Sequence, residues 1–310
     1  MNNQNFQVDF IGIGAPKTGT TWLAKCLAQH PQICFSRVKE VNFFNQENFF
    51  FIKSQVLNEG SNYERGLDWY KKHFEHYQPG QIKGEFSVIY LYDKETPRRI
   101  HENFPTAKII AIIRNPIELF YTHYYHVKSQ WKLPPLETFV NEKSDFLKYG
   151  FFADCLERYA KYFPPEQMLV LFHDDLKKDP AAAVKNVYNF LEVDENFVPR
   201  SLHEKVNVTA PKTVLEVKLF FSLRNWLIKT VGKKIVAYPR LLKTGLKIDQ
   251  FIRQTLKKTS NRRKSFKTMP AVLQQKLIDL YLPEIERLEK IFNRDLGAWK
   301  KISTGTQYID

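Results

Sequence analysis

The most chemically suggestive residues of this 310-residue chain form a short loop, Gly14-Ala-Pro-Lys-Thr-Gly-Thr-Thr21. An apolar run at 8–14 leads into the loop, and a helical pattern follows it. Where a strand turns into a helix, backbone N–H groups and the positive end of the helix dipole point at the turn, and threonine hydroxyls add further donors. The loop therefore predicts a site for a phosphate or a similar anion. An ordinary strand-to-helix turn is the alternative.

The lysine of this loop does not occupy the position that it has in ATP-binding P-loops. That motif places lysine directly after the second glycine, whereas here Thr20 follows Gly19 and the lysine is Lys17. Asp174 or Asp175, which follow an apolar stretch, could hold magnesium in a kinase. A small-molecule kinase that uses ATP and magnesium thus stays open, although a buried strand with an acidic turn explains the same residues.

Residue types that bind metals or form disulfides make no recognisable set. The three cysteines, Cys26, Cys34 and Cys155, show no CxxC spacing, which argues against a structural zinc site or a disulfide framework. His123 and His126 lie three residues apart, but no third ligand is evident. We therefore expect no metal and a packed or surface role for these two histidines.

Strand-like and helix-like stretches alternate over the first two thirds of the chain, which predicts an α/β fold with a parallel sheet. The run AKIIAII is β-branched and apolar, as in a central strand buried on both faces. Arg114 follows it, and Asn115 and Pro116 are typical of a helix start. Strands are predicted at 8–14, 32–36, the start of 81–92, 107–113 and 168–175, and helices from the Gly-Thr-Thr to Pro31 and at 66–77, 94–103, 115–131, 152–163 and 181–192.

The loop, Arg114 and a hydroxyl at Thr122 together resemble the motifs of sulfotransferases that use 3′-phosphoadenosine 5′-phosphosulfate (PAPS). The resemblance implies a P-loop-like α/β sulfotransferase fold, in which a central parallel sheet is flanked by helices and carries helical additions. It implies that Arg114 and Thr122 hold the 3′-phosphate, although family members usually have serine in place of Thr122. It also implies a 5′-phosphosulfate site made of Pro16, Lys17, Thr18, Gly19, Thr20 and Thr21.

Further stretches are similar to the heparan-sulfate type of sulfotransferase and its bacterial relatives, among them Lys39-Glu-Val-Asn-Phe-Phe44 and Gly84-Glu-Phe-Ser87. In that branch the glutamate of the first stretch is the general base, which implies that Glu40 is catalytic. Lys17 would neutralise charge on the leaving phosphate oxygen. The branch often has lysine where this chain has Phe86, so a second catalytic lysine cannot be carried over. Glu85 and Ser87 are either ligand contacts or polar groups satisfied at a strand end.

The basic charge of the chain is concentrated in one late segment. The net charge is +14, and residues 212–268 hold 16 Lys or Arg against Glu216 and Asp249. This mainly helical, basic insertion at about 213–268 could be a solvated face, a groove for an acidic acceptor or an amphipathic surface for peripheral membrane contact. No specific nucleic-acid partner is expected. A packed helix is predicted at about 271–292, and residues 1–310 are interpreted as a single sulfotransferase domain.

The sequence thus predicts transfer of a sulfuryl group from PAPS to a hydroxyl or amine of a small-molecule, glycan or lipid-linked acceptor. No signal peptide or membrane-spanning run is evident, so we expect a cytoplasmic location. The kinase is one alternative. A noncatalytic protein that binds membranes or polyanions through 213–268 is the other, and the oligomeric state is left open.

Overall fold

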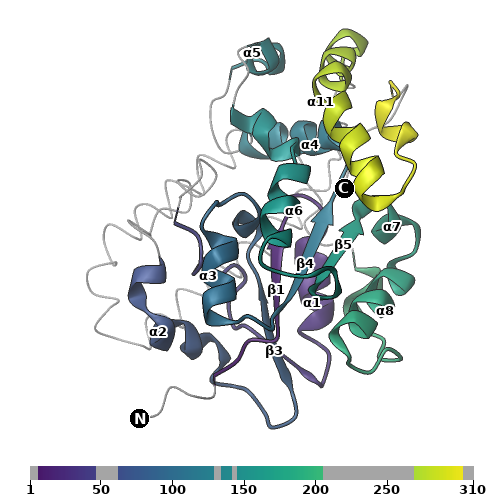
Figure 1. Ribbon diagram of the computed structural model, residues 1–310. Helices are drawn as coiled ribbons and strands as arrows, with labels where there is room; N and C mark the ends of the chain where they lie inside the picture. Colours follow the sequence, from purple (N-terminus) through teal and green to yellow (C-terminus); the bar gives the residue numbers. More distant parts are fainter. Residues whose placement is uncertain (1–5, 47–61, 129–133, 142–144, 205–268, 303–310) are drawn as a thin grey trace, which may run out of the picture.

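A five-stranded parallel sheet forms the centre of the part of the chain that the computed structural model describes, residues 6–46, 62–128, 134–141, 145–204 and 269–302 (Figure 1). The strand order is β2-β3-β1-β4-β5, and all neighbouring pairs are parallel. The sheet and its covering helices confirm the predicted α/β class. The strands are β1 (Phe10–Gly14), β2 (Ile33–Phe35), β3 (Ile82–Phe86), β4 (Lys108–Ile113) and β5 (Met168–Phe172).

Successive residues of the inner strands point to opposite sides of the sheet. Apolar side chains therefore lie on both faces, and helices cover both. In β4, Ile110 and Ile112 pack with α1 (Thr20–Leu27) and α8 (Pro180–Leu191), whereas Ile109 and Ile113 belong to the core on the other face. That second core includes side chains of α3 (Thr96–Asn103), α4 (Pro116–Lys128) and α6 (Ala153–Ala160). Asn115 accepts a hydrogen bond from the N–H of Ile117 at 2.9 Å, as predicted for the cap of α4.

Gly12 of β1 lets a neighbouring strand place a large ring directly over it. A Cβ at Gly12 would lie 2.1–2.4 Å from the ring of Phe86, which is fully buried. Phe86 therefore belongs to the core beside α1, and the position where relatives of the heparan type often carry lysine is used here for packing.

Several predicted elements end earlier than expected. The strand predicted over 168–175 stops at Phe172, and the next residues begin α7 (His173–Lys178). β5 is also an edge strand in the described sheet, so Met168, Leu169 and Val170 are only half-buried. The helix predicted over 66–77 is α2 (Leu67–Lys71) followed by a 3-10 turn, and α1 ends before Pro31. A further helix, α5 (Leu136–Asn141), was not predicted.

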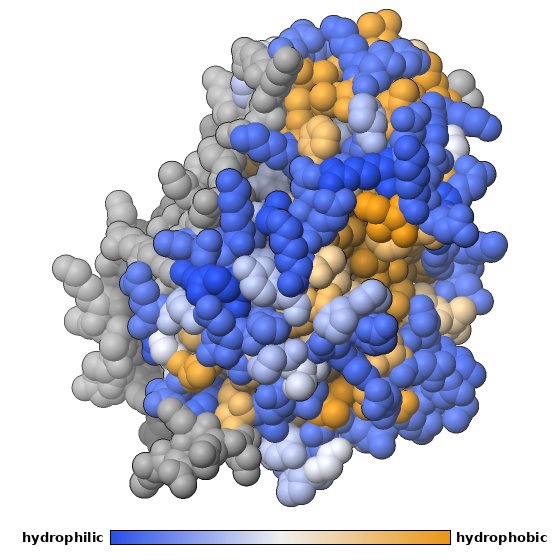
Figure 2. Space-filling view, viewed as in Figure 1, coloured by the Kyte–Doolittle hydropathy of each residue, from blue (hydrophilic) through white to orange (hydrophobic). Residues whose placement is uncertain are grey.

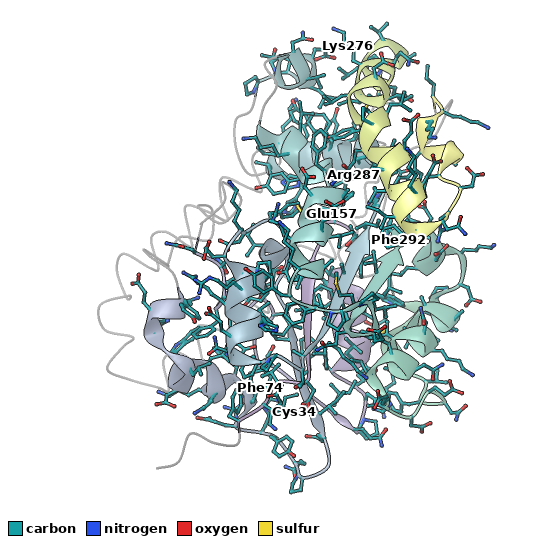
Figure 3. All side chains as sticks on the ribbon, in the orientation of Figure 1. Cys34, Phe74, Glu157, Lys276, Arg287 and Phe292 are labelled. Carbon is teal, nitrogen blue, oxygen red and sulfur yellow. The ribbon has the colours of Figure 1, made fainter. Side chains whose placement is uncertain are left out.

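The C-terminal helix α11 (Ala271–Phe292) spans the range expected from the sequence and continues through Pro283. Arg287 of α11 pairs with Glu157 of α6, and the two side chains lie next to each other in Figure 3. The Glu284 carboxylate accepts a 2.7 Å hydrogen bond from the N–H of Ala153, and Phe292 packs against Phe172. These contacts join α11 to the main body.

The surface is mainly hydrophilic on the face shown in Figure 2, with hydrophobic side chains gathered towards the end where α11 lies. Exposed apolar residues of α11 include Val272 and Ile291. None of the described helices combines the length and apolar character that crossing a bilayer demands. The basic segment 213–268 lies outside the described residues.

Candidate functional site

The loop between β1 and α1 has the geometry expected of an anion site. Gly19 is the residue before the helix, with φ of 93°, and has no side chain that could accept from the first-turn N–H groups. The Thr18 hydroxyl donates to the carbonyl of Ala15 at 2.7 Å and thereby closes the turn. Lys17 is half-buried and also has a positive φ. Of the two helical threonines, Thr20 is buried and Thr21 half-buried, and Pro16 is half-buried in the loop.

Two side chains from neighbouring strand ends hold the carbonyl groups of this loop. Arg114, directly after β4, donates to the Lys17 carbonyl at 3.0 Å. The Nδ1 atom of His173, directly after β5, lies 3.0 Å from the Thr18 carbonyl, and since a carbonyl only accepts, Nδ1 carries the proton. Both residues lie at the carboxyl edge of the sheet, where ligands of open α/β folds bind. His173 was missed by the sequence analysis, which placed it inside the strand predicted over 168–175.

Arg114 is completely buried and is neutralised in place by Glu118 of α4. Its Nε and Nη2 atoms lie 3.0 and 2.9 Å from the same carboxylate oxygen. The structure thus gives Arg114 a positioning role on the loop. Binding of a 3′-phosphate by Arg114 stays a prediction.

Thr122 of α4 supplies a buried hydroxyl that fits a phosphate-binding role. The residue is 3% exposed, and its Oγ1 atom has no hydrogen-bond partner among the described residues. A buried hydroxyl without a partner costs free energy, and a ligand oxygen would remove this cost. The role of Thr122 in binding a 3′-phosphate stays a prediction.

Glu40 lies in the irregular segment after β2, close enough to Glu85 of β3 for its charge to raise the pKa of Glu85. The Lys39 ammonium lies 3.2 Å from its carboxylate, and the Glu40 side chain is 27% exposed. The same ammonium lies 5.7 Å from the centroid of the Phe86 ring. Glu40 is therefore a partly exposed carboxylate, as a general base that contacts an acceptor requires.

Glu85 and Ser87 are both fully buried. Of their two interpretations, polar groups satisfied at a strand end and ligand contacts, the first therefore describes them. Ser87 Oγ donates to the Glu85 carboxylate at 2.6 Å. Burial raises the pKa of Glu85 to about 7, the nearby Glu40 charge also raises it, and hydrogen bonds from Ser87, Tyr90 and Tyr70 oppose the rise. The sequence analysis singled out Glu85 and Ser87, but it gave no sign that Tyr90 and Tyr70 donate to the same carboxylate.

The remaining candidate residues have structural partners. His123 is buried with its ring against Phe146 and Tyr149, and burial holds its pKa well below the usual range. Asp174 accepts a 2.8 Å hydrogen bond from the Trp299 indole, and Asp175 pairs with Arg294, which lowers the pKa of Asp175. The two carboxylates proposed for magnesium in a kinase thus bind the C-terminal segment. Among the described residues, no three His, Cys, Asp or Glu side chains form a metal-binding group.

Comparison with known proteins identifies relatives of this chain. The family model described as "Sulfotransferase domain" matches residues 7–217. Bifunctional heparan sulfate N-deacetylase/N-sulfotransferase 4 of Mus musculus is 30% identical over 210 residues, which cover 61% of this chain and 22% of that protein. Heparan sulfate glucosamine 3-O-sulfotransferase 6 of Homo sapiens is 30% identical over 190 residues, which cover 58% of this chain and 50% of that protein. The chain therefore matches half or less of the length of these two relatives.

The fold is also found in a solved structure, a sulfotransferase from Alicyclobacillus acidocaldarius. The TM-score is 0.64 at 22% identity, and the match covers 96% of this chain and 100% of the other. At this identity the comparison shows the fold alone. It agrees with the P-loop-like architecture that the sequence predicted.

Proposed function

The chain belongs to the sulfotransferase domain family, and from this premise we propose that it transfers a sulfuryl group from PAPS to a hydroxyl or amine. Three features of segments that follow the carboxyl ends of β1, β2 and β4 support the proposal. These are the anion loop held by Arg114, the orphaned hydroxyl of Thr122 and the partly exposed carboxylate of Glu40.

In this proposal each residue has one task. The loop N–H groups and Lys17 bind the 5′-phosphosulfate end, and Arg114 and Thr122 bind the 3′-phosphate. When bound, PAPS supplies the sulfuryl group, and adenosine 3′,5′-bisphosphate is the product. Glu40 removes the proton from the acceptor hydroxyl or amine as the new bond forms. Lys17 neutralises the charge that develops on the leaving oxygen.

The acceptor class follows from the relatives and from charge. Both named relatives act on heparan sulfate, one of them at glucosamine, and the net charge of +14 favours an acidic acceptor. A glucosamine-containing glycan is therefore the first acceptor to test, with a small-molecule or lipid-linked acceptor next. Membrane contact through 213–268 and a cytoplasmic location stay predictions.

Thermal unfolding with two nucleotides separates this proposal from the kinase. A ligand at a hundred times its dissociation constant adds about 2.7 kcal/mol of stability. Adenosine 3′,5′-bisphosphate should raise the melting temperature, whereas ATP with magnesium should not. The opposite result would favour the kinase, and no shift with either would favour the noncatalytic alternative.

Acceptor transfer is then measured with labelled PAPS and two glycan oligosaccharides that differ only at glucosamine. One has free amines and the other has acetylated amines, so that only hydroxyls can react. Transfer to the first alone indicates N-sulfation, and transfer to both indicates O-sulfation. Absence of transfer to either glycan would direct the search to small-molecule and lipid-linked acceptors.

A further inference from the structure

The segment that carries Glu40 is held by side chains, and its backbone is not part of the described sheet. After β2 ends at Phe35, the carbonyl groups of Val41 and Asn42 each accept from the amide of Asn62 at 3.2 Å. The Phe44 carbonyl accepts from Arg99 at 3.0 Å. The position of Glu40 therefore depends on the side chains that bind residues 41–44.

The N–H groups of this segment bind two hydroxyls. Ser87 Oγ accepts from the N–H of Asn42 at 3.0 Å. The Tyr90 hydroxyl accepts from the N–H of Phe43 at 2.7 Å and, more weakly, from that of Phe44 at 3.3 Å. A backbone N–H can only donate, so each hydroxyl must direct its single proton elsewhere.

Both hydroxyl protons point to the same carboxylate. Ser87 donates to Oε2 of Glu85 at 2.6 Å, and Tyr90 donates to Oε1 at 2.7 Å, where the Tyr70 hydroxyl also donates at 3.3 Å. Above its raised pKa of about 7 the Glu85 carboxylate is ionised, so it only accepts and can take all three bonds. Glu85, Ser87, Tyr90 and Tyr70 are each completely buried, which excludes water as a competing partner.

We propose that Glu85 is a positioning residue of the catalytic site: through the hydroxyls of Ser87 and Tyr90 it orients the backbone of residues 42–44 and thereby fixes Glu40 towards the acceptor. The inference deepens the proposed function and rests on it, because the position of Glu40 matters for turnover only if Glu40 is the base. Glu85 itself touches no substrate. Its burial costs stability, which explains why a carboxylate with no cation in direct contact needs three hydroxyl donors.

Hydrogen–deuterium exchange tests the anchor without any substrate. The probe is a peptide that contains residues 42–44, measured in the wild type, Tyr90→Phe and Glu85→Gln. Tyr281→Phe is the matched control, because Tyr281 is equally buried and its hydroxyl donates to the Leu147 carbonyl at 2.7 Å. We expect this peptide to exchange about tenfold faster in Tyr90→Phe and Glu85→Gln than in the wild type. In Tyr281→Phe its exchange rate should not change. Unchanged exchange in both network variants overturns the proposal.

Turnover and nucleotide affinity distinguish positioning of Glu40 from general core stability. In Tyr90→Phe, turnover of labelled PAPS with the glycan acceptor should fall about tenfold or more. If Tyr90→Phe folds poorly, the milder variant Ser87→Ala is used and should show the same fall. Affinity for adenosine 3′,5′-bisphosphate should stay within about twofold, since the loop at 14–21 keeps its contacts. Faster exchange with unchanged turnover contradicts the role on Glu40. If the wild type itself transfers nothing, the proposed function has failed and the exchange result alone decides whether Glu85 anchors the segment.

Discussion

The guanidinium of Arg114 donates a 3.0 Å hydrogen bond to the carbonyl of Lys17, a residue 97 positions earlier in the chain. The bond joins the end of β4 to the loop that follows β1, and these two strands are neighbours in the sheet. Arg114, which we expect to bind the 3′-phosphate, thus also shapes the loop at 14–21, which we expect to bind the 5′-phosphosulfate.

Replacement of Arg114 by alanine should weaken nucleotide binding through both roles. The loop loses its support, and Glu118, only 22% exposed, loses its cation. We expect affinity for adenosine 3′,5′-bisphosphate to fall by about tenfold or more, as measured by calorimetry. Arg98→Ala is the control, because Arg98 forms exposed ion pairs with Glu95 and Glu102. An unchanged affinity in Arg114→Ala would remove Arg114 from the site.

His173 should be replaceable by asparagine but not by phenylalanine. Asparagine keeps an N–H donor near the position of Nδ1, whereas phenylalanine fills the space and leaves the Thr18 carbonyl without this bond. We expect His173→Phe to reduce bisphosphate affinity about fivefold to tenfold and His173→Asn to retain most of it. Equal affinities in the two variants would show that the bond to Thr18 has no effect on the loop.

Thr122→Val should affect the free and the bound protein in opposite directions. Valine has the shape of threonine without the buried hydroxyl that lacks a partner. The free protein should therefore be as stable as the wild type or more so, whereas bisphosphate affinity should fall by about 1 kcal/mol, a factor of roughly five. Thermal unfolding with and without the nucleotide measures both. A loss of stability in the free protein together with unchanged affinity would contradict a ligand-binding hydroxyl.

Glu40→Ala should separate chemistry from binding. Removal of a general base lowers turnover by about two to four orders of magnitude, whereas bisphosphate binding should persist because Glu40 lies outside the loop. Glu75→Ala, which removes an exposed ion pair with Arg37 in the adjacent region, is the control for nonspecific effects. Wild-type turnover in Glu40→Ala would exclude Glu40 as the base.

The contribution of Glu85 to stability should fall as pH rises. Burial raises its pKa from 4.5 to about 7, so the folded state binds more protons than the unfolded state between these values. Its contribution is fully present below about pH 4.5 and is lost as pH rises through about 7, with a total of roughly 3 kcal/mol. Urea unfolding of the wild type and Glu85→Gln at pH 5 and pH 8 measures this.

The comparison with Glu85→Gln is needed because other groups also titrate: burial raises the pKa of Glu284 as well. The difference between the two proteins isolates the effect of Glu85. Between pH 5 and pH 8 the change in unfolding free energy should be less favourable in the wild type than in Glu85→Gln, which lacks the titrating carboxyl. Identical pH dependence in the two proteins would contradict a raised pKa of Glu85.

Local patterns predicted the parts of the fold that local chemistry determines. The strand before Arg114 follows from its β-branched, apolar run, and the start of α4 follows from Asn115 and Pro116. The loop at 14–21 was recognisable for the same reason. By contrast, the bond from His173 to Thr18 joins residues 155 positions apart, and the bonds from residues 42–44 to Ser87 and Tyr90 join residues 45 to 47 positions apart. No pattern within a short window contains that information.

The contacts of α7 have a consequence for the order in which the protein is made. His173 at the start of α7 supports the Thr18 carbonyl, and α7 is itself tied to Arg294 and Trp299 through Asp175 and Asp174. The ribosome makes the loop near residue 18 long before it makes residues 294–299. A nascent chain thus acquires the full support of its loop at 14–21 only after the C-terminal segment has emerged.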